Sequence, residues 1–151
     1  MKVKDVMTPR CECVDPDTTL EKAAQRMQEL DVGPLPVCDH DHLAGIVTDR
    51  DIVIRAVADG RDPHTTRVRD VMTPGVSYCL EDDDVASAAE TMKDKQIRRL
   101  VVLNGDKRLV GIVSLGDLAV VTNDQPLAGE TLRRISEPSL QAEEIPLATP
   151  Y

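Results

Sequence analysis

Two aspartates stand in matching positions along the chain, and each follows a hydroxyl-bearing residue by three positions. Thr48 precedes Asp51, and Ser114 precedes Asp117. An ionised carboxylate accepts hydrogen bonds and donates none, so each aspartate is suited to a ligand that carries hydroxyl groups. The same spacing also fits an aspartate that simply caps a helix. The sequence therefore offers two candidate binding positions, with a structural alternative for each of them.

Adjacent arginines at Arg98 and Arg99 are the second feature with chemical potential. A guanidinium group is planar, and its forked donors match the oxygens of a phosphate. The alternative is that both are solvated charges or partners of carboxylates, because the 151-residue chain has 27 acidic and 18 basic residues. The net charge of −9 argues against a nucleic-acid partner, which would need a basic surface.

Catalysis and metal binding find little support in the sequence. No nucleophile stands beside a recognisable base, and there is no glycine-rich phosphate loop. Cys38, His40 and His42 lie in one short stretch, and Cys11 and Cys13 are close together, so metal ligation is a conceivable alternative. The Asp-His-Asp-His stretch is more simply a hairpin turn. We therefore predict neither a catalytic site nor a metal site.

An internal repeat positions the candidate residues. The sequence Asp-Val-Met-Thr-Pro occurs at 5–9 and again at 70–74, and Gly-Ile-Val followed by Thr or Ser occurs at 45–48 and 111–114. The offset is 65 residues early in the repeat and 66 residues late, so one residue is inserted between these blocks. We place the insertion in a hairpin turned by Asn-Gly, a dipeptide typical of tight turns.

Each repeat is predicted to fold as strand, helix, strand, strand, helix. In the first repeat these elements are a short extended segment at 11–14, a helix at 20–30 that begins with a capping box of Thr18 and Glu21, a hairpin at 35–48, and a helix at 51–58 that ends at Gly60. In the second they are a helix capped by Asp83, a hairpin turned at Asn104 and Gly105, and a closing helix that begins at Leu118. We expect an α/β fold in which two pseudo-twofold-related β-α-β-β-α units pack sheet to sheet, with units at 1–60 and 68–121, a linker at 61–67, and a C-terminal helix (125–135) and mobile tail within 122–151.

These paired motifs resemble the tandem CBS-domain pair, also called a Bateman module. The resemblance covers residues 3–121, and it is specific because several motifs occur twice in the same order. It implies a pair of α/β units that binds an adenosine derivative (AMP, ADP, ATP or S-adenosylmethionine) in two clefts between the units. It also implies a regulatory role, frequent dimerisation, and no required cofactor.

The resemblance implies which residues form each cleft, with the two aspartates accepting hydrogen bonds from ribose hydroxyls. The first cleft would combine Thr48 and Asp51 with Val76, Arg98 and Arg99. The second would combine Ser114 and Asp117 with Val14, Gly33 and Pro34. We expect the first cleft to bind a nucleotide. The second would lack cations, so we expect it to bind weakly or to prefer a ligand without phosphates.

We expect this chain to be a stand-alone regulatory module in the cytoplasm, a homodimer, and a binder of an adenosine-type small molecule that acts on an unidentified protein. It contains no apolar run of the ~20 residues that a membrane span needs, so we expect no membrane partner. The alternative is a structural or interaction protein whose clefts are empty and which acts only through dimerisation or partner binding.

Overall fold

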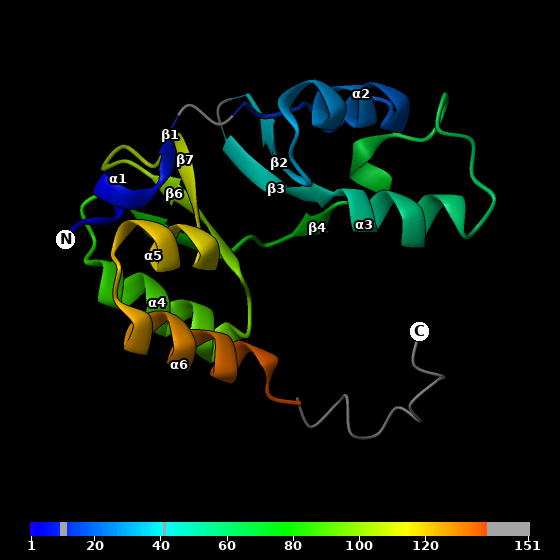
Figure 1. Ribbon diagram of the computed structural model, residues 1–151. Coiled ribbons are helices and arrows are strands. Elements are labelled where there is room, and N and C mark those ends of the chain that lie inside the picture. Colours follow the sequence, from blue (N-terminus) through cyan, green and yellow to red (C-terminus); the bar gives the residue numbers. More distant parts are fainter. Residues whose placement is uncertain (10–11, 41, 139–151) are drawn as a thin grey trace.

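The computed structural model describes residues 1–9, 12–40 and 42–138 and has a mixed α/β fold, as predicted (Figure 1). The chain forms two packing units, each with its own hydrophobic core and one sheet. The first sheet has the order β2-β3-β4, with β2 (Pro34–Asp39), β3 (His42–Thr48) and β4 (Thr73–Pro74). The second has the order β1-β7-β6-β5, with β1 (Thr8–Pro9), β7 (Leu109–Ser114), β6 (Arg99–Leu103) and β5 (Tyr78–Leu80). Neighbouring strands are antiparallel except for β5 and β6, which are parallel.

Helices cover each sheet, and in the second unit the last helix packs on two other helices and not on the sheet. The first unit uses α2 (Leu20–Leu30), α3 (Asp49–Ile52), its π-helical continuation η1 (Val53–Val57), and the 3-10 turn η2 (Val68–Asp70). The second unit uses α1 (Val3–Val6), α4 (Val85–Lys95), α5 (Leu115–Val121) and α6 (Gln125–Ser136). The expected C-terminal helix is therefore present as α6, whereas residues 139–151 of the expected mobile tail lie outside the described residues.

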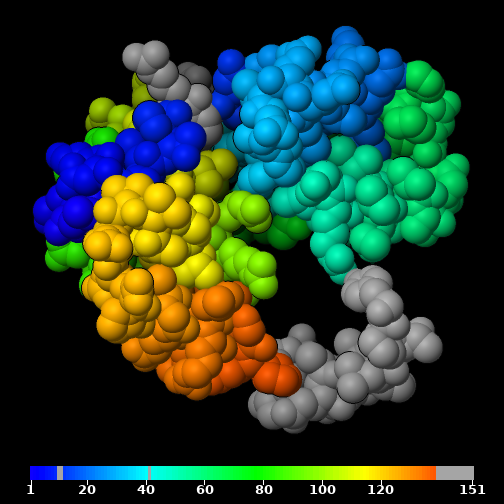
Figure 2. All heavy atoms as spheres, viewed as in Figure 1, coloured from blue at the N-terminus to red at the C-terminus, as the bar shows by residue number. Residues whose placement is uncertain are grey.

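The opening segment of each repeat packs into the unit formed mainly by the other repeat. Val3 and Val6 belong to the core of the second unit, whereas Val68 and Val71 belong to the core of the first. The short strands follow the same exchange, because β1 pairs with β7 and β4 pairs with β3. Figure 2 shows the dark-blue N-terminal residues beside the yellow atoms of α5, apart from the lighter blue of α2. The sequence repeats and the packing units are therefore not the same segments.

Equivalent hydrogen bonds hold the two exchanged segments in place. The Val3 N–H donates to the carbonyl of Asp83 (2.9 Å), and the Val68 N–H donates to the carbonyl of Thr18 (2.8 Å). Ion pairs between Lys4 and Asp82 and between Arg69 and Asp17 lie beside these bonds at equivalent positions. Such exposed pairs contribute little stability, so the buried valines and the backbone hydrogen bonds are what hold each opening segment in the other unit.

Two predicted helix caps are wrong by one residue. The N-cap of α2 is Thr19, whose hydroxyl accepts the N–H of Lys22 (3.4 Å), and the N-cap residue of α4 is Asp84. Thr18 and Asp83, the predicted caps, instead accept hydrogen bonds through their carbonyls from the exchanged segments. The Asp83 carboxylate accepts the Leu80 N–H (2.9 Å), so this side chain stabilises the turn before the helix instead of capping it.

The hairpin of the second unit contains the inserted residue, as predicted, but not in a two-residue turn. Cys38 pairs with Leu43 in the first hairpin and Leu103 with Leu109 in the second, so residues 39–42 are replaced by residues 104–108. The Asn104 side chain accepts the N–H groups of residues 106 (2.9 Å) and 108 (3.0 Å), and the positive φ in this turn belongs to Lys107 (61°). The asparagine therefore caps a longer loop instead of occupying a tight turn.

Glycine is required where each exchanged strand pairs with its neighbour in the sheet. A Cβ placed on Gly111 would lie 2.6 Å from the Thr8 carbonyl oxygen, and one on Gly45 would lie 2.6 Å from the Thr73 carbonyl oxygen. We predict that Gly111→Ala and Gly45→Ala each lower the free energy of unfolding by about 1–3 kcal/mol, the usual cost of overpacking.

Urea denaturation of both variants tests this prediction, with Gly105→Ala as the control because nothing lies within 4 Å of a Cβ at that position. Equal stability of Gly111→Ala, Gly45→Ala and the control would show that the close crossings do not constrain the fold.

Candidate functional site

Both candidate aspartates take part in capping boxes at the starts of the closing helices. The Asp51 side chain accepts the Thr48 N–H (3.0 Å), and the Thr48 hydroxyl accepts the Asp51 N–H (3.1 Å). Ser114 and Asp117 make the same pair of bonds, at 2.9 and 3.1 Å. Thr48 and Ser114 are thus the N-cap residues, so α3 and α5 begin before the residues predicted to start them. Both aspartates therefore stabilise helix starts, but this role uses only one carboxylate oxygen (Oδ2) of each and leaves Oδ1 for other partners.

The remaining oxygens of the two aspartates have different surroundings. Asp51 Oδ1 lies 3.9 Å from Arg55 Nε, and the same guanidinium donates to the carbonyl of Val71 (3.0 Å). The residue equivalent to Arg55, at the offset of 66 that relates Thr48 to Ser114, is Val121. Within the described residues, Asp117 Oδ1 makes no ion pair. It is therefore the carboxylate oxygen that is available to a ligand.

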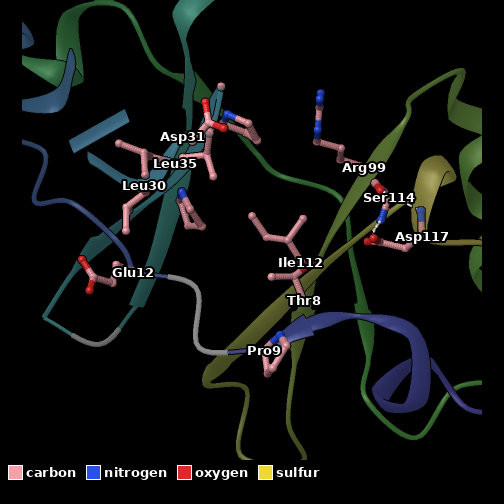
Figure 3. Close-up of a pocket in the computed structure, with 14 residues that line it drawn as sticks. Thr8, Pro9, Glu12, Leu30, Asp31, Leu35, Arg99, Ile112, Ser114 and Asp117 are labelled. Carbon is pink, nitrogen blue, oxygen red and sulfur yellow. Dashed lines mark hydrogen bonds between the residues drawn. The ribbon is translucent and has the colours of Figure 1, made fainter. Parts of the chain in front are cut away.

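A cavity of about 460 Å³ lies between the two packing units, with Ser114 and Asp117 at one side (Figure 3). Its wall from the first unit and the segment before it is made by Glu12, Leu30, Asp31, Val32, Gly33, Pro34, Leu35 and Pro36. Its wall from the second unit is made by Thr8, Pro9, Arg99, Ile112, Ser114 and Asp117. Figure 3 shows Leu30, Leu35 and Asp31 opposite Ile112, Ser114 and Asp117 across the open space. We call this the inter-unit cavity.

Among the described residues, Arg99 supplies a cation to this wall, although we expected the cleft of Ser114 and Asp117 to lack one. The reason is the register of β6 and β7, in which Arg99 is directly opposite Ser114. Residues directly opposite each other in an antiparallel pair project from the same face of the sheet. An arginine at this position is therefore placed beside the serine of its own repeat.

The inter-unit cavity joins five of the ten predicted site residues: Gly33, Pro34, Arg99, Ser114 and Asp117. The other five, Thr48, Asp51, Val76, Arg98 and Val14, are not in its wall. Val14 is buried in the core of the first unit, where its N–H donates to the Pro36 carbonyl (2.9 Å). Val14 therefore contributes to the core of the first unit, next to the Pro36 backbone.

Sequence reasoning missed two acidic residues in the cavity wall. Asp31 is the left-handed C-cap of α2 (φ 54°), and Glu12 forms an ion pair with Arg26. Asp31 could have been identified from its position at the end of the predicted helix, two residues before Gly33, because Gly33 and Pro34 were already expected in this cleft. Because Glu12 is paired, the unpaired charges that face the cavity among the described residues are those of Arg99, Asp31 and Asp117.

Other residues with chemical potential lie outside the cavity. Tyr78 is about half exposed on β5. Burial raises the pKa of the Cys79 thiol to about 12, so this thiol serves packing and not chemistry. Among the described residues no group of three His, Cys, Asp or Glu side chains could hold a metal ion, although Cys11 and Asp41 are outside the described ranges. None of the described helices has the length and apolarity needed to span a membrane.

Comparison with known proteins identifies the family. The model of the CBS domain matches residues 3–57 and 68–124, so the chain belongs to the CBS domain family and carries two of these domains in tandem. The CBS domain-containing protein YhcV of Bacillus subtilis (strain 168) is 39% identical over 138 residues, which are 91% of this chain and 97% of YhcV.

Solved structures of CBS domain proteins share this fold. Hypoxic Response Protein I, with two coordinated zinc ions, is 38% identical with a TM-score of 0.70, covering 79% of this chain and 97% of that one. CBSX2 in complex with AMP is 27% identical (TM-score 0.68), and the CBS domain pair of MJ0100 in complex with 5-methylthioadenosine and S-adenosyl-L-methionine is 26% identical (TM-score 0.72). Each of the latter two covers 83% of this chain and 98% of its own length.

The capping box predicts how substitutions of Asp117 affect folding. Asp117→Ala removes the acceptor for the Ser114 N–H and should lower the free energy of unfolding by about 1 kcal/mol. Asp117→Asn keeps an amide oxygen for that bond, so its effect should be smaller. Urea denaturation of both variants checks the order, and an equal loss in the two would contradict the capping role.

Proposed function

We propose that this protein is a regulatory module that binds an adenosine-containing ligand in the inter-unit cavity and catalyses no reaction. The observation that carries the proposal is the available oxygen of Asp117 at the wall of a cavity between the two CBS units. The complexes of CBSX2 with AMP and of MJ0100 with adenosine derivatives support the ligand class.

The proposed binding mode follows from the chemistry of the wall. A ribose has two neighbouring hydroxyl groups, and Asp117 Oδ1 can accept a hydrogen bond from both. Leu30, Leu35 and Ile112 offer apolar surface to the faces of an adenine ring. Ser114 and Arg99, which are opposite each other in the sheet, then lie beside the ribose with a hydroxyl and a guanidinium group.

Thr48, Asp51 and Val76 are proposed to form a second, weaker position for a ribose. Arg55 lies 3.9 Å from the Asp51 oxygen that a ribose would use, so a ligand there has to compete with a guanidinium group. The sequence led us to expect tighter binding in the cleft of Thr48 and Asp51. We now propose the reverse order, because Arg99 lines the cavity that contains Asp117.

A ligand in the inter-unit cavity would contact both units, which is how we propose that it regulates a protein not yet identified. Binding shifts the relative arrangement of the units only to the extent that the ligand prefers one arrangement over another. We place this module in the cytoplasm, where an exposed thiol such as that of Cys13 stays reduced.

Binding of adenosine tests the proposed site. We expect adenosine to bind the wild-type protein by isothermal titration calorimetry and to raise its Tm by mass action. In Asp117→Asn, the amide oxygen remains bonded to the Ser114 N–H and the NH2 group faces the cavity, so the acceptor for the ribose is lost. Affinity should fall about tenfold or more, as expected for a hydrogen bond to a charged group.

Asp51→Asn is the matched control, because it makes the same change in the equivalent capping box. A larger loss of adenosine affinity in Asp51→Asn than in Asp117→Asn would place the main site in the other cleft. Absence of adenosine binding to the wild-type protein would favour the alternative of an interaction protein with empty clefts.

We also propose that the protein is a homodimer through the exposed apolar residues of its closing helices. Val53, Ile54 and Val57 of η1 are 53%, 51% and 60% exposed, and Val120 of α5 is 81% exposed. Apolar side chains grouped on one helical segment commonly mark an interface.

Size-exclusion chromatography with light scattering tests the dimer. Val57→Asp introduces a charge into the proposed interface without touching a core residue, so we expect it to convert a dimer to a monomer with little change in Tm. Ala86→Asp, which adds the same charge at an exposed position of α4 outside the closing helices, is the control. A wild-type monomer, or an unchanged dimer in Val57→Asp, would contradict this interface.

A further inference from the structure

A second cavity, of about 500 Å³, lies between α5, α6 and the start of β6 (the two helices are labelled in Figure 1). Helix α6 supplies one wall, although it begins at Gln125 and so lies beyond the two segments that match the CBS domain. Two arginines and several small or apolar residues face this space. They include Arg98, Arg99, Leu115, Ala119, Ala128 and Leu132. We call this the α5–α6 cavity.

The charge of this cavity is opposite to that of the chain as a whole. Among the described residues its lining contains two guanidinium groups and no carboxylate, in a protein with a net charge of −9. Both Arg98 and Arg99 are exposed, and within the described part of the chain neither side chain forms an ion pair or a hydrogen bond. Arg26, Arg69 and Arg133, in contrast, are paired with carboxylates. The cavity therefore favours an occupant that is both acidic and apolar.

The 139–151 segment, which lies outside the described residues, has this composition. It contains two adjacent carboxylates, Glu143 and Glu144, and no lysine, arginine or histidine. Leu140 and Ile145 stand on either side of the two carboxylates. Carboxylates match the forked donors of arginine, and the leucine and isoleucine match the apolar residues of the wall.

The end of α6, which leads into this segment, is held by contacts with α4. Lys93 on α4, which is only 6% exposed, forms ion pairs with Glu90 (2.9 Å) and with Glu130 on α6 (3.9 Å). The Gln96 side chain donates to the carbonyls of Arg134 (3.1 Å) and Glu137 (2.7 Å). Helix α6 is therefore a fixed wall of the cavity and a fixed starting point for the residues that follow it.

The starting point lies close to the arginine pair. Gln96 contacts the Glu137 carbonyl and precedes Arg98 by two residues, so the Cα atoms of Gln96 and Arg98 lie at most about 7.6 Å apart. Six residues separate Glu137 from Glu143, and six extended residues span about 20 Å. The two carboxylates of the 139–151 segment can therefore reach the arginine pair of the same chain.

We propose that the 139–151 segment folds back into the α5–α6 cavity, where Glu143 and Glu144 form ion pairs with the arginine pair. A tether of a few residues gives a local concentration in the millimolar range, so a contact too weak to form between separate molecules is populated within one chain. Arg99 also lines the inter-unit cavity. The docked segment would therefore neutralise the cation near Asp117 and act as an autoinhibitory contact against anions.

Backbone 15N relaxation of the whole 151-residue chain tests this contact. At low salt we expect order parameters above about 0.6 at residues 143 and 144, and values below about 0.6 in the double variant Arg98→Ala, Arg99→Ala. Salt at 1 M, where the Debye length is about 3 Å, should have the same effect. Arg108→Ala is the matched control, because it removes an exposed arginine from the turn at the other end of the same hairpin.

An exchange of charges tests the pairing itself. Glu143→Arg with Glu144→Arg should lower the order parameters of the segment, because four positive charges then repel one another. Adding Arg98→Glu and Arg99→Glu to this variant should restore the order, because the attraction returns with the signs reversed. Both arginines are exposed, so these substitutions should leave the fold intact.

Three results would overturn the proposal. The first is an order parameter below about 0.6 at both glutamates of the wild-type chain at low salt. The second is order that persists in the arginine double variant, since the segment would then bind elsewhere. The third is order that the 15N-labelled arginine double variant regains when it is mixed with unlabelled Glu143→Gln, Glu144→Gln protein, since the segment would then occupy the cavity of another copy.

This contact does not depend on the proposed function, because it is measured without a ligand. Loss of the contact leaves the adenosine titrations of wild type and Asp117→Asn as they are. Failure of adenosine to bind, in turn, leaves the relaxation experiment unchanged. The two proposals therefore fail separately.

Discussion

The exchange of the two opening segments is the constraint on which the rest of the structure depends. Each segment contributes two buried valines and a short strand to the unit formed mainly by the other repeat. Because these residues complete both cores, the two units cannot separate without exposing apolar surface, which is costly in water. The same exchange brings Thr8 and Pro9 to the wall of the inter-unit cavity. The exchange therefore supplies one part of the cavity wall.

Repetition of one fold has produced two positions with unequal chemistry, and a few substitutions account for the difference. Arg55 approaches the free oxygen of Asp51, whereas Val121 is its counterpart beside Asp117. Pro34 is opposite Thr48 in the first hairpin, where the second hairpin has Arg99 opposite Ser114. The backbone sets equivalent positions in both units, and the side chains at these positions decide which one presents an available acceptor next to a cation.

Much of the fold could be predicted from the sequence because local signals and the repeat agreed with each other. Helix α2, the two hairpins and α6 follow from apolar spacing and turn residues. The caps were predicted one residue too early, at Thr18 and Asp83, because neighbouring residues can both cap and the Asp83 carboxylate is bonded to the Leu80 N–H instead. The tight turn at Asn104 was wrong because the asparagine side chain satisfies two N–H groups of a longer loop. For the site, the hydroxyl and carboxylate pairs were visible, but the assignment of Arg99 to the other cleft ignored the register of its own hairpin.

The close approach at Gly45 and Gly111 has a consequence for how such a chain can arise. Each glycine lies beside the opening strand of the other repeat. A polypeptide with one repeat would therefore have an unpaired position at its glycine and an opening strand without a partner in the same unit. Two such polypeptides complete each other by donating their strands reciprocally. Joining them end to end converts a meeting of separate molecules into a reaction within one molecule, which no longer depends on their concentration.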